Sequence, residues 1–220
     1  MALNLIMLGP PGAGKGTQAE RFARTRGIPK ISTGDILRES VQAGTALGQR
    51  AKAVMDRGEL VSDEIMIGIV KERLDRDDAR SGFVLDGFPR TVRQAEALDE
   101  IMAARDPLII VDMVVPHAEL VRRLASRMVC ADCGANGVPG ELECRRCTGK
   151  LVQRTDDNDA VVIERLRVYN TSTKPVLDFY RMRPTFRSIN GAQPPDRVMA
   201  DLNAAIEAAG APVTPRGVRP

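Results

Sequence analysis

Short apolar runs alternate with stretches of helical periodicity along most of the chain. Residues 3–8 are apolar at nearly every position and predict a fully buried strand, and shorter strands are expected over residues 30–32, 83–85 and 109–115. Helices are expected over residues 16–26, 62 to about 76 and 91–104, and another is expected to start at residue 34. A further helix should contain Arg123 and Arg127. A last pair of helices should start near residue 159 and be kinked or divided at Pro175. Strands alternating with such helices predict an α/β fold built on a parallel sheet.

Residues at the predicted helix ends support these boundaries. Gly27 follows the last helical position of the first helix and stops it. Ser32 or Thr33 can cap the helix that starts at Gly34, and the acidic pair after Ser62 suits the start of the next helix. The chain shows no internal sequence repeat.

Length and composition predict one globular domain with insertions. The 220 residues are 43% hydrophobic and 28% charged. Residues 108–115 form a long apolar run, but Asp112 interrupts it and it is far shorter than the roughly 20 residues of a membrane helix. The first residues lack a signal-peptide pattern, so we expect a cytoplasmic protein. Residues 211–220 are expected to form a disordered tail.

A glycine-rich segment lies between the first strand and the first helix. The sequence Gly9 to Thr17 contains the pattern G-x-x-x-x-G-K in the strand-to-helix context of a phosphate-binding loop, rather than that of a plain glycine-rich turn. Its backbone N–H groups would surround phosphate oxygens, and Lys15 would bridge the outer phosphates. The usual serine or threonine after the lysine is Gly16, so Thr17 would replace it only in part. A magnesium ion would then need a carboxylate that holds its waters.

Asp86 is the candidate for that carboxylate. It follows a predicted strand at its carboxyl end, where open α/β sheets bind ligands; the alternative is an aspartate in a surface turn. Arg90 follows closely and offers a guanidinium suited to phosphate. Arg90 and Gln94 are four residues apart at the start of a predicted helix, so they should share a face that suits a nucleotide. For Gln94 alone, simple surface polarity is an equally good explanation.

Four cysteines are confined to one short segment. Cys130 and Cys133 form one C-x-x-C pair, and Cys144 and Cys147 form a second. Four thiolates predict a closed tetrahedral zinc site with a structural role, while two disulfides or a redox pair are the alternatives.

Three motifs in order resemble the adenylate kinase family. They are the glycine-rich loop, Ser32-Thr-Gly-Asp-Ile-Leu-Arg38 and Leu85-Asp-Gly-Phe-Pro-Arg90, and the resemblance extends to about residue 207. It implies a five-stranded parallel P-loop sheet flanked by helices, a helical AMP-binding insertion over residues 32–61 and a zinc lid over residues 124–161 whose inter-knuckle loop is short. It also implies reversible magnesium-dependent transfer between ATP and AMP to give two ADP, with no general base.

The resemblance assigns further site residues. For AMP it implies Thr33, Arg38, Glu59, Val61, Gly87, Arg90, Gln94, Arg154 and Arg165. For ATP it implies Gly12, Ala13, Gly14, Lys15, Gly16, Thr17, Arg123, Arg127 and Gln193. The catalytic charges would be Lys15, Arg38, Arg90, Arg123, Arg127, Arg154 and Arg165, with Asp86 holding Mg²⁺ through water and Asp35 as a second carboxylate nearby. Independently, Arg123 and Arg127 lie four residues apart on one predicted helix, which indicates that an anion separates their charges.

Two other functions are weighed against this interpretation. Another nucleoside monophosphate kinase would share the loop and the Asp-Gly-Phe-Pro-Arg motif. A zinc-ribbon NTPase that binds nucleic acid would share the cysteines, but the net charge of only +3, the 3% aromatic content and the lack of tryptophan argue against a basic aromatic face. We expect a monomer, and we interpret the single histidine, His117, as an exposed residue at a helix start.

Overall fold

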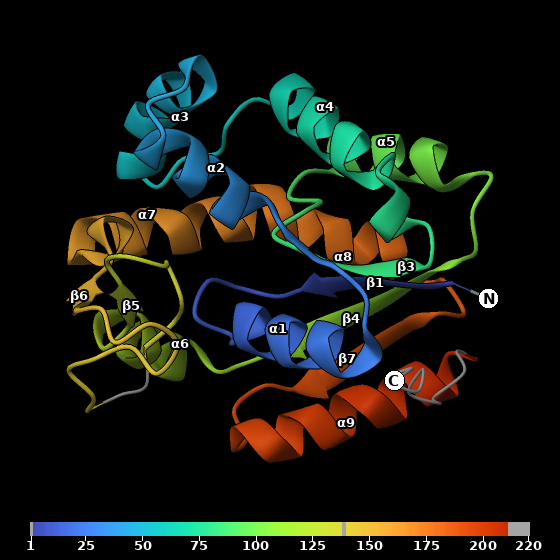
Figure 1. The fold of residues 1–220 in the computed structure, drawn as a ribbon. Coiled ribbons are helices and arrows are strands. Elements are labelled where there is room, and N and C mark those ends of the chain that lie inside the picture. The colour runs from blue at the N-terminus through green and yellow to red at the C-terminus, as the bar shows by residue number, and fades with distance from the viewer. Residues whose placement is uncertain (1, 138–139, 211–220) are drawn as a thin grey trace, which may run out of the picture.

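A parallel five-stranded sheet forms the centre of the computed structural model, which describes residues 2–137 and 140–210 (Figure 1). The strand order is β2-β3-β1-β4-β7. The strands are β1 (Leu3–Leu8), β2 (Lys30–Ser32), β3 (Gly82–Asp86), β4 (Leu108–Val114) and β7 (Phe186–Asn190). The four strands expected from the apolar runs are confirmed, two of them with the predicted bounds. The α/β fold class is therefore confirmed.

Helices cover both faces of this sheet (Figure 1). They are α1 (Lys15–Arg26), α2 (Thr33–Gln42), α3 (Ala46–Asp56), α4 (Asp63–Leu74), α5 (Val92–Met102), α6 (His117–Ala125), α7 (Asp159–Val168), α8 (Lys174–Tyr180) and α9 (Pro195–Ala208). Short turns are η1 (Asp77–Ala79), η2 (Thr155–Asp157) and the π-helical turn η3 (Tyr169–Thr173). A separate antiparallel hairpin pairs β5 (Met128–Cys130) with β6 (Leu151–Gln153).

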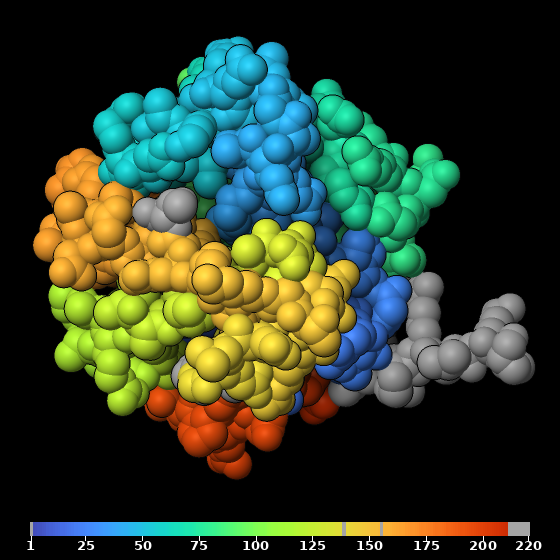
Figure 2. Space-filling model, turned by 60° about the vertical axis from the view of Figure 1, so that its left-hand side comes forward, coloured from blue at the N-terminus to red at the C-terminus, as the bar shows by residue number. Residues whose placement is uncertain are grey.

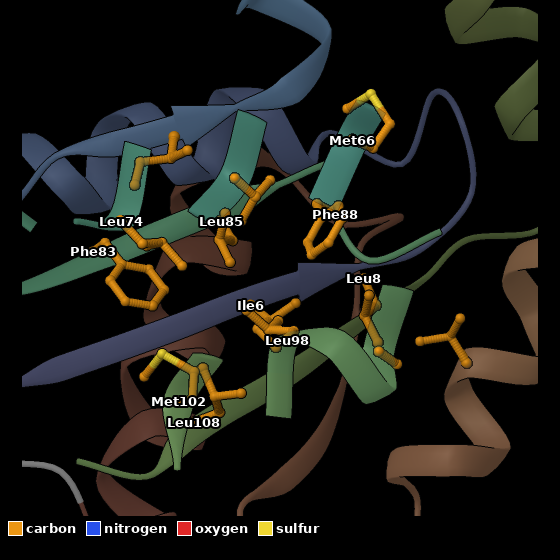
Figure 3. Packing of buried hydrophobic residues seen from close by; sticks show 14 of the residues in the cluster. Ile6, Leu8, Met66, Leu74, Phe83, Leu85, Phe88, Leu98, Met102 and Leu108 are labelled. Carbon is orange, nitrogen blue, oxygen red and sulfur yellow. The ribbon is translucent and has the colours of Figure 1, made fainter. Parts of the chain in front are cut away.

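Two hydrophobic cores hold the helices to the sheet, one on each face. On one face, Ile6 and Leu85 pack with residues of α4, α5 and α8, as Figure 3 shows for much of this cluster. On the other face, Leu5 packs with Phe22 of α1 and Leu202 of α9. Burying each such side chain contributes about 1.5–3 kcal/mol. Because β1, β3 and β4 are buried on both faces, their runs are apolar rather than alternating.

The ends of several helices follow local chemistry. Gly27 ends α1 in a left-handed conformation with φ 65°, as expected. Ser32 is the residue that caps α2, because its Oγ accepts a hydrogen bond from the Asp35 N–H at 3.3 Å, so this helix starts one residue earlier than predicted. In α4, the first residue, Asp63, accepts hydrogen bonds from Thr91 and Gln94.

Three sequence predictions about helices need correction. Helix α6 ends at Ala125, so Arg127 lies beyond the helix and does not share a face with Arg123. Helix α5 begins at Val92, so Arg90 precedes it and does not share a helix face with Gln94. The run near Pro175 is divided, and the division is a π-helical turn that ends before the proline.

Two elements had no clear signal in the sequence. Strand β7 is an edge strand in which Ile189 alone is fully buried, so it lacks an apolar run, and α9 was not singled out. The tail predicted over residues 211–220 lies outside the described residues. Within the described part of the chain, each helix is too short or too polar to cross a membrane.

Candidate active site

The glycine-rich loop connects β1 to α1 at the carboxyl edge of the sheet. Gly14 adopts φ 94° immediately before α1, a conformation that favours glycine and turns the loop into the helix. Lys15 folds back over the loop, and its Nζ donates to the carbonyl oxygens of Gly9 at 2.8 Å and Pro10 at 2.9 Å. Burial lowers the pKa of Lys15 to about 8, although nearby Asp86 opposes this shift.

Asp86 ends β3 beside this loop, as predicted. Strands β1 and β3 are paired in parallel with Met7 opposite Asp86, which places the carboxylate next to the start of the loop. A Cβ atom at Gly16 would lie 3.2 Å from Asp86 Oδ2 and 3.9 Å from Asn136 Nδ2. The space between the loop and the carboxylate at Gly16 is therefore narrow, and a side chain at this position would crowd Asp86. Asn136, from the cysteine-rich segment, borders the same space, and Figure 2 shows that segment (yellow) adjoining the blue N-terminal part.

Arg90 is held by its backbone and its Nε, which leaves its terminal nitrogens available. Its N–H donates to Gln94 Oε1 at 2.7 Å, and its Nε donates to the Gly87 carbonyl at 2.8 Å. The same carbonyl accepts from Thr33 Oγ1 at 2.9 Å. Burial lowers the pKa of Arg90, while Asp86 raises it. Within the described ranges, neither terminal nitrogen of Arg90 has a hydrogen-bond or ion-pair partner.

A pocket lies in front of Arg90 and is lined by several separate segments. Its lining residues are Thr33, Gly34, Leu37, Arg38, Met55, Gly58, Glu59, Leu60, Val61, Met66, Gly87, Arg90, Gln94, Arg154, Asp156 and Arg165. The structure thus brings together all nine residues that the resemblance implies for AMP. Sequence reasoning missed the apolar residues Leu37, Met55 and Met66, whose positions on helices α2 to α4 gave no functional signal.

The other arginines proposed for the site have carboxylate partners. The pairs are Arg38 with Asp35, Arg123 with Glu119, Arg127 with Asp157, Arg154 with Asp156, and Arg165 with both Asp156 and Asp157. The anions expected near Arg123 and Arg127 are therefore separate carboxylates of the protein. Burial raises the pKa of Asp156, but Arg154 and Arg165 outweigh this effect and lower that pKa to about 2.

Asp156 and Asp157 are the main polar residues that sequence reasoning missed. Asp157 has a fully buried side chain that accepts from Arg127 Nε at 2.6 Å and from Arg165 at 2.8 Å. An acidic pair two residues after Arg154 is a weak signal for a local ion pair. The contact with Arg127 spans 30 residues, so the sequence held no sign of it.

The remaining predicted residues lie around the loop. Arg123 donates to the Gly191 carbonyl at 2.9 Å, in the connection between β7 and α9 that also contains Gln193. Gln193 Nε2 donates to Asp201 Oδ2 at 2.6 Å. Thr17 is exposed on the first turn of α1, and His117 is the exposed first residue of α6.

Asp35, the second carboxylate expected near the magnesium waters, is engaged by cations. Lys30 Nζ donates to its Oδ2 at 3.0 Å, and Arg38 donates to its other oxygen. Burial raises the pKa of Asp35, but Lys30 and Arg38 together lower it to about 2. Asp35 is therefore an ionised residue that orients Arg38 in this structure.

The four cysteines converge on one point. Their ligand atoms lie within 4.8 Å of one another, with 3.4 Å between the Sγ atoms of Cys130 and Cys147 and 3.6 Å between those of Cys133 and Cys144. These are free thiols rather than disulfides, which need about 2.05 Å between sulfurs. Four sulfurs around a zinc ion at about 2.3 Å would lie about 3.8 Å apart, so this donor set fits zinc.

The two cysteine pairs share one backbone geometry. The N–H of Cys130 donates to the Ala135 carbonyl, and the N–H of Cys144 donates to the Gly149 carbonyl, five residues on in each case. Gly134 and Thr148 hold equivalent positions with φ 68° and 59°. The segment is thus built from two similar turns that present their thiols to a common centre, a repeat in geometry that the residue types do not reveal.

Comparisons with known proteins agree with this geometry. The sequence profile of the family described as "Adenylate kinase" matches residues 7–185. A protein of Archaeoglobus fulgidus named "Adenylate kinase" is 49% identical over 213 residues, covering 93% of this chain and 98% of that protein. Proteins with the same name from Geobacillus sp. (strain WCH70) and Geobacter sp. (strain M21) are 48% and 46% identical, covering 91% and 94% of this chain and 96% and 100% of their own lengths.

Proposed function

The chain belongs to the adenylate kinase family, and from that premise we propose how its residues divide the transfer of a phosphoryl group between ATP and AMP. The chain is a phosphotransferase of the nucleoside monophosphate kinase type. Its substrates are then ATP, AMP and ADP. The roles of single residues that follow are our proposal.

Two partly buried cations without carboxylate partners carry the proposal. Among the described residues, the charged groups of Lys15 and Arg90 donate hydrogen bonds only to backbone oxygens, although both side chains are partly withdrawn from solvent. Charges withdrawn from water are unfavourable unless an anion neutralises them. Burial lowers the pKa of both cations and Asp86 raises it, so Asp86 lies near each of them. We infer that two phosphates bind here, one on each side of Asp86.

Each nucleotide then has its own side of the site. We assign ATP to the glycine-rich loop, with its phosphates at the N–H groups of residues 12–17 and Lys15, and with Arg123 and Gln193 nearby. We assign AMP to the pocket in front of Arg90. The apolar lining from Leu37, Met55 and Met66 suits the faces of a base. Arg154 and Arg165 line the same pocket and would add positive charge near the phosphates.

The transfer itself needs position and charge more than proton chemistry. The attacking oxygen belongs to an ionised phosphate of AMP, so a general base is unnecessary. Lys15, Arg90 and the neighbouring arginines would stabilise charge on the transferring group. Closure of the cysteine-rich segment over the loop would exclude water, and the adenylate kinase lid is a well-known example of such closure.

Magnesium would bind beside Asp86. The carboxylate lies beside the loop at Gly16, where the chain offers no side-chain oxygen, and Mg²⁺ usually keeps several waters and takes one or two carboxylates. When bound, the ion neutralises charge on the ATP phosphates. Asp86 would hold its waters, and the hydroxyl of Thr17 would replace only in part the one that is missing at position 16.

We also propose that the four cysteines hold one structural zinc ion. Cys130, Cys133, Cys144 and Cys147 complete four-coordination, which leaves the ion no open position for substrate. The segment over residues 124–161 would then be the lid and residues 32–61 the AMP-binding insertion. A monomer in the cytoplasm is the expected state of the protein.

A panel of acceptors tests the choice of AMP over other monophosphates. With ATP and Mg²⁺ fixed, we expect AMP to give the highest kcat/KM, well above GMP, UMP and CMP, because Gln94 and the apolar lining are placed to recognise adenine. The measurement is coupled detection of ADP. A higher kcat/KM with UMP or CMP would reassign the chain to another specificity within the family.

Zinc removal should weaken the lid and leave the core chemistry in place. A structural zinc site contributes on the order of 10 kcal/mol to a small module, and within the described part of this segment the hydrophobic cluster has only Cys130, Cys144 and Leu151 as buried members. We expect Cys130→Ser to lower bound zinc from about one per chain, lower the melting temperature and reduce ADP formation several-fold.

Arg145→Ala is the matched control for this prediction. Arg145 is exposed in the same segment, where it pairs with Glu141, so its loss should change none of the three readouts measurably. Metal-free protein with an unchanged melting curve would refute the zinc lid. Complete loss of transfer with an intact fold would instead make the metal catalytic.

A further inference from the structure

A hydroxyl from a distant turn contacts the backbone of Arg90. Thr173 Oγ1 donates a hydrogen bond to the Arg90 carbonyl oxygen at 3.0 Å, across 83 residues of sequence. Thr173 is 9% exposed, so water has little access to this contact. The mechanism described above does not use Thr173.

The π-helical turn η3 brings this hydroxyl to Arg90. Its widened geometry is seen in the N–H of Lys174, which donates to the carbonyl of Tyr169, five residues back. Thr171 in the same turn shows the ordinary alternative, since its Oγ1 donates within its own helix to the Arg167 carbonyl at 3.1 Å. Thr173 instead directs its hydroxyl to another segment of the chain.

The bond completes a set of contacts that fix Arg90 on three sides. Gln94 accepts from its N–H, Gly87 accepts from its Nε, and Thr173 donates to its carbonyl. Helix α8, which follows Thr173, is itself anchored to α5 by the hydrogen bond from Tyr180 Oη to the Ala95 carbonyl at 3.3 Å. Thr173 ends η3 and directly precedes this anchored helix, so the packing of α8 against α5 sets its position.

We propose that Thr173 is a positioning residue that holds Arg90 in line with the acceptor phosphate, an inference that rests on the role of Arg90 proposed above. Without the hydroxyl, the Arg90 carbonyl loses a partner in a place with little water. The segment from Gly87 to Arg90 can then shift, and a guanidinium displaced by a fraction of an ångström stabilises the transferring group less well.

The test compares Thr173→Val with Thr173→Ser. Valine keeps the shape of threonine and removes the hydroxyl, and we expect kcat to fall about 10-fold and the KM for AMP to rise, with the KM for ATP unchanged. Serine keeps the hydroxyl and should restore kcat to within about 2-fold of the natural protein. Thr173→Ala serves as a second variant without the hydroxyl if the valine variant is poorly folded.

Thr171→Val is the matched control, because it removes a hydroxyl from the same turn without touching Arg90. It should leave kcat and both KM values unchanged. Melting temperatures of all variants are measured on the same samples. Equal losses in Thr173→Val and Thr173→Ser, or an unchanged kcat in folded Thr173→Val, would overturn the proposal.

A double-mutant cycle separates this proposal from the role of Arg90 itself. In the Arg90→Ala background, Thr173→Val should cause no further loss of kcat, because the guanidinium that it positions is absent. The same 10-fold loss in both backgrounds would overturn the positioning role. If Arg90→Ala alone left AMP kinetics unchanged, the proposed role of Arg90 would fail first, and the cycle would show that failure directly.

Discussion

Lys15→Met is expected to reduce phosphoryl transfer by a factor on the order of 1000 and to leave the fold intact. Lys15 is the partly buried cation of the glycine-rich loop, and its charge would act on the outer phosphates as they transfer. Methionine fills a similar volume without the charge. Because a desolvated charge without a carboxylate partner is removed, the melting temperature of the free protein should stay the same or rise. Turnover close to that of the natural protein would remove the basis for assigning this loop to ATP.

The pH dependence of ATP binding is an independent test of the role of the Lys15 charge. The pKa of Lys15 in the free protein is about 8, and bound phosphate should raise it. The affinity for ATP should therefore be highest below about pH 8, where Lys15 is protonated with and without ATP. It should fall as the pH rises above about 8, until the pH reaches the higher pKa that Lys15 has with ATP bound. We expect this decline in the natural protein, measured by calorimetry, and its absence in Lys15→Met.

Arg90→Ala should lower kcat/KM for AMP about 100-fold or more. Arg90 lines the acceptor pocket, and among the described residues its terminal nitrogens have no partner, so two parallel hydrogen bonds to a phosphate would both bind it and fix its direction of attack. The KM for AMP should rise and kcat should fall together, while the dissociation constant of ATP stays close to its natural value. Steady-state kinetics with each substrate varied, together with ATP titrations, measure the three quantities.

Arg93→Ala is the control for that variant. Arg93 lies three residues later and forms an exposed ion pair with Glu64, at 63% and 62% side-chain exposure. Its loss should change none of these quantities by more than a small factor. A change in ATP affinity alone in Arg90→Ala would show that Arg90 serves the other nucleotide.

The sequence predicted those parts of the molecule that depend on neighbouring residues. The run at residues 3–8 became β1 because every position is buried, and Gly27 ended α1 because it tolerates the left-handed conformation. Asp86 lies beside the loop because parallel strands bring their carboxyl ends to one edge. The role assignments of the site residues remain predictions until they are measured.

The features that sequence reasoning missed depend on contacts between distant segments. Arg123 and Arg127 were expected to share a helix and an anion, but the helix ended first and each arginine found its own carboxylate. Thr173 gave no signal, because its importance arises from a π-helical turn and a partner 83 residues away. Strand β7 was missed because an edge strand needs few apolar residues.

The carboxylates that hold the arginines also shape how the enzyme should respond to ionic strength. Asp156 and Asp157 occupy Arg127, Arg154 and Arg165 before any nucleotide arrives. A phosphate that binds these arginines must replace the Asp156 or Asp157 carboxylate as their partner, so one ion pair is exchanged for another. The net gain in charge neutralisation then comes mainly from Lys15 and Arg90. The proposed site has seven cations, and five of them are already paired with carboxylates of the protein. Salt should therefore weaken nucleotide binding by the amount expected for Lys15 and Arg90 alone rather than for all seven.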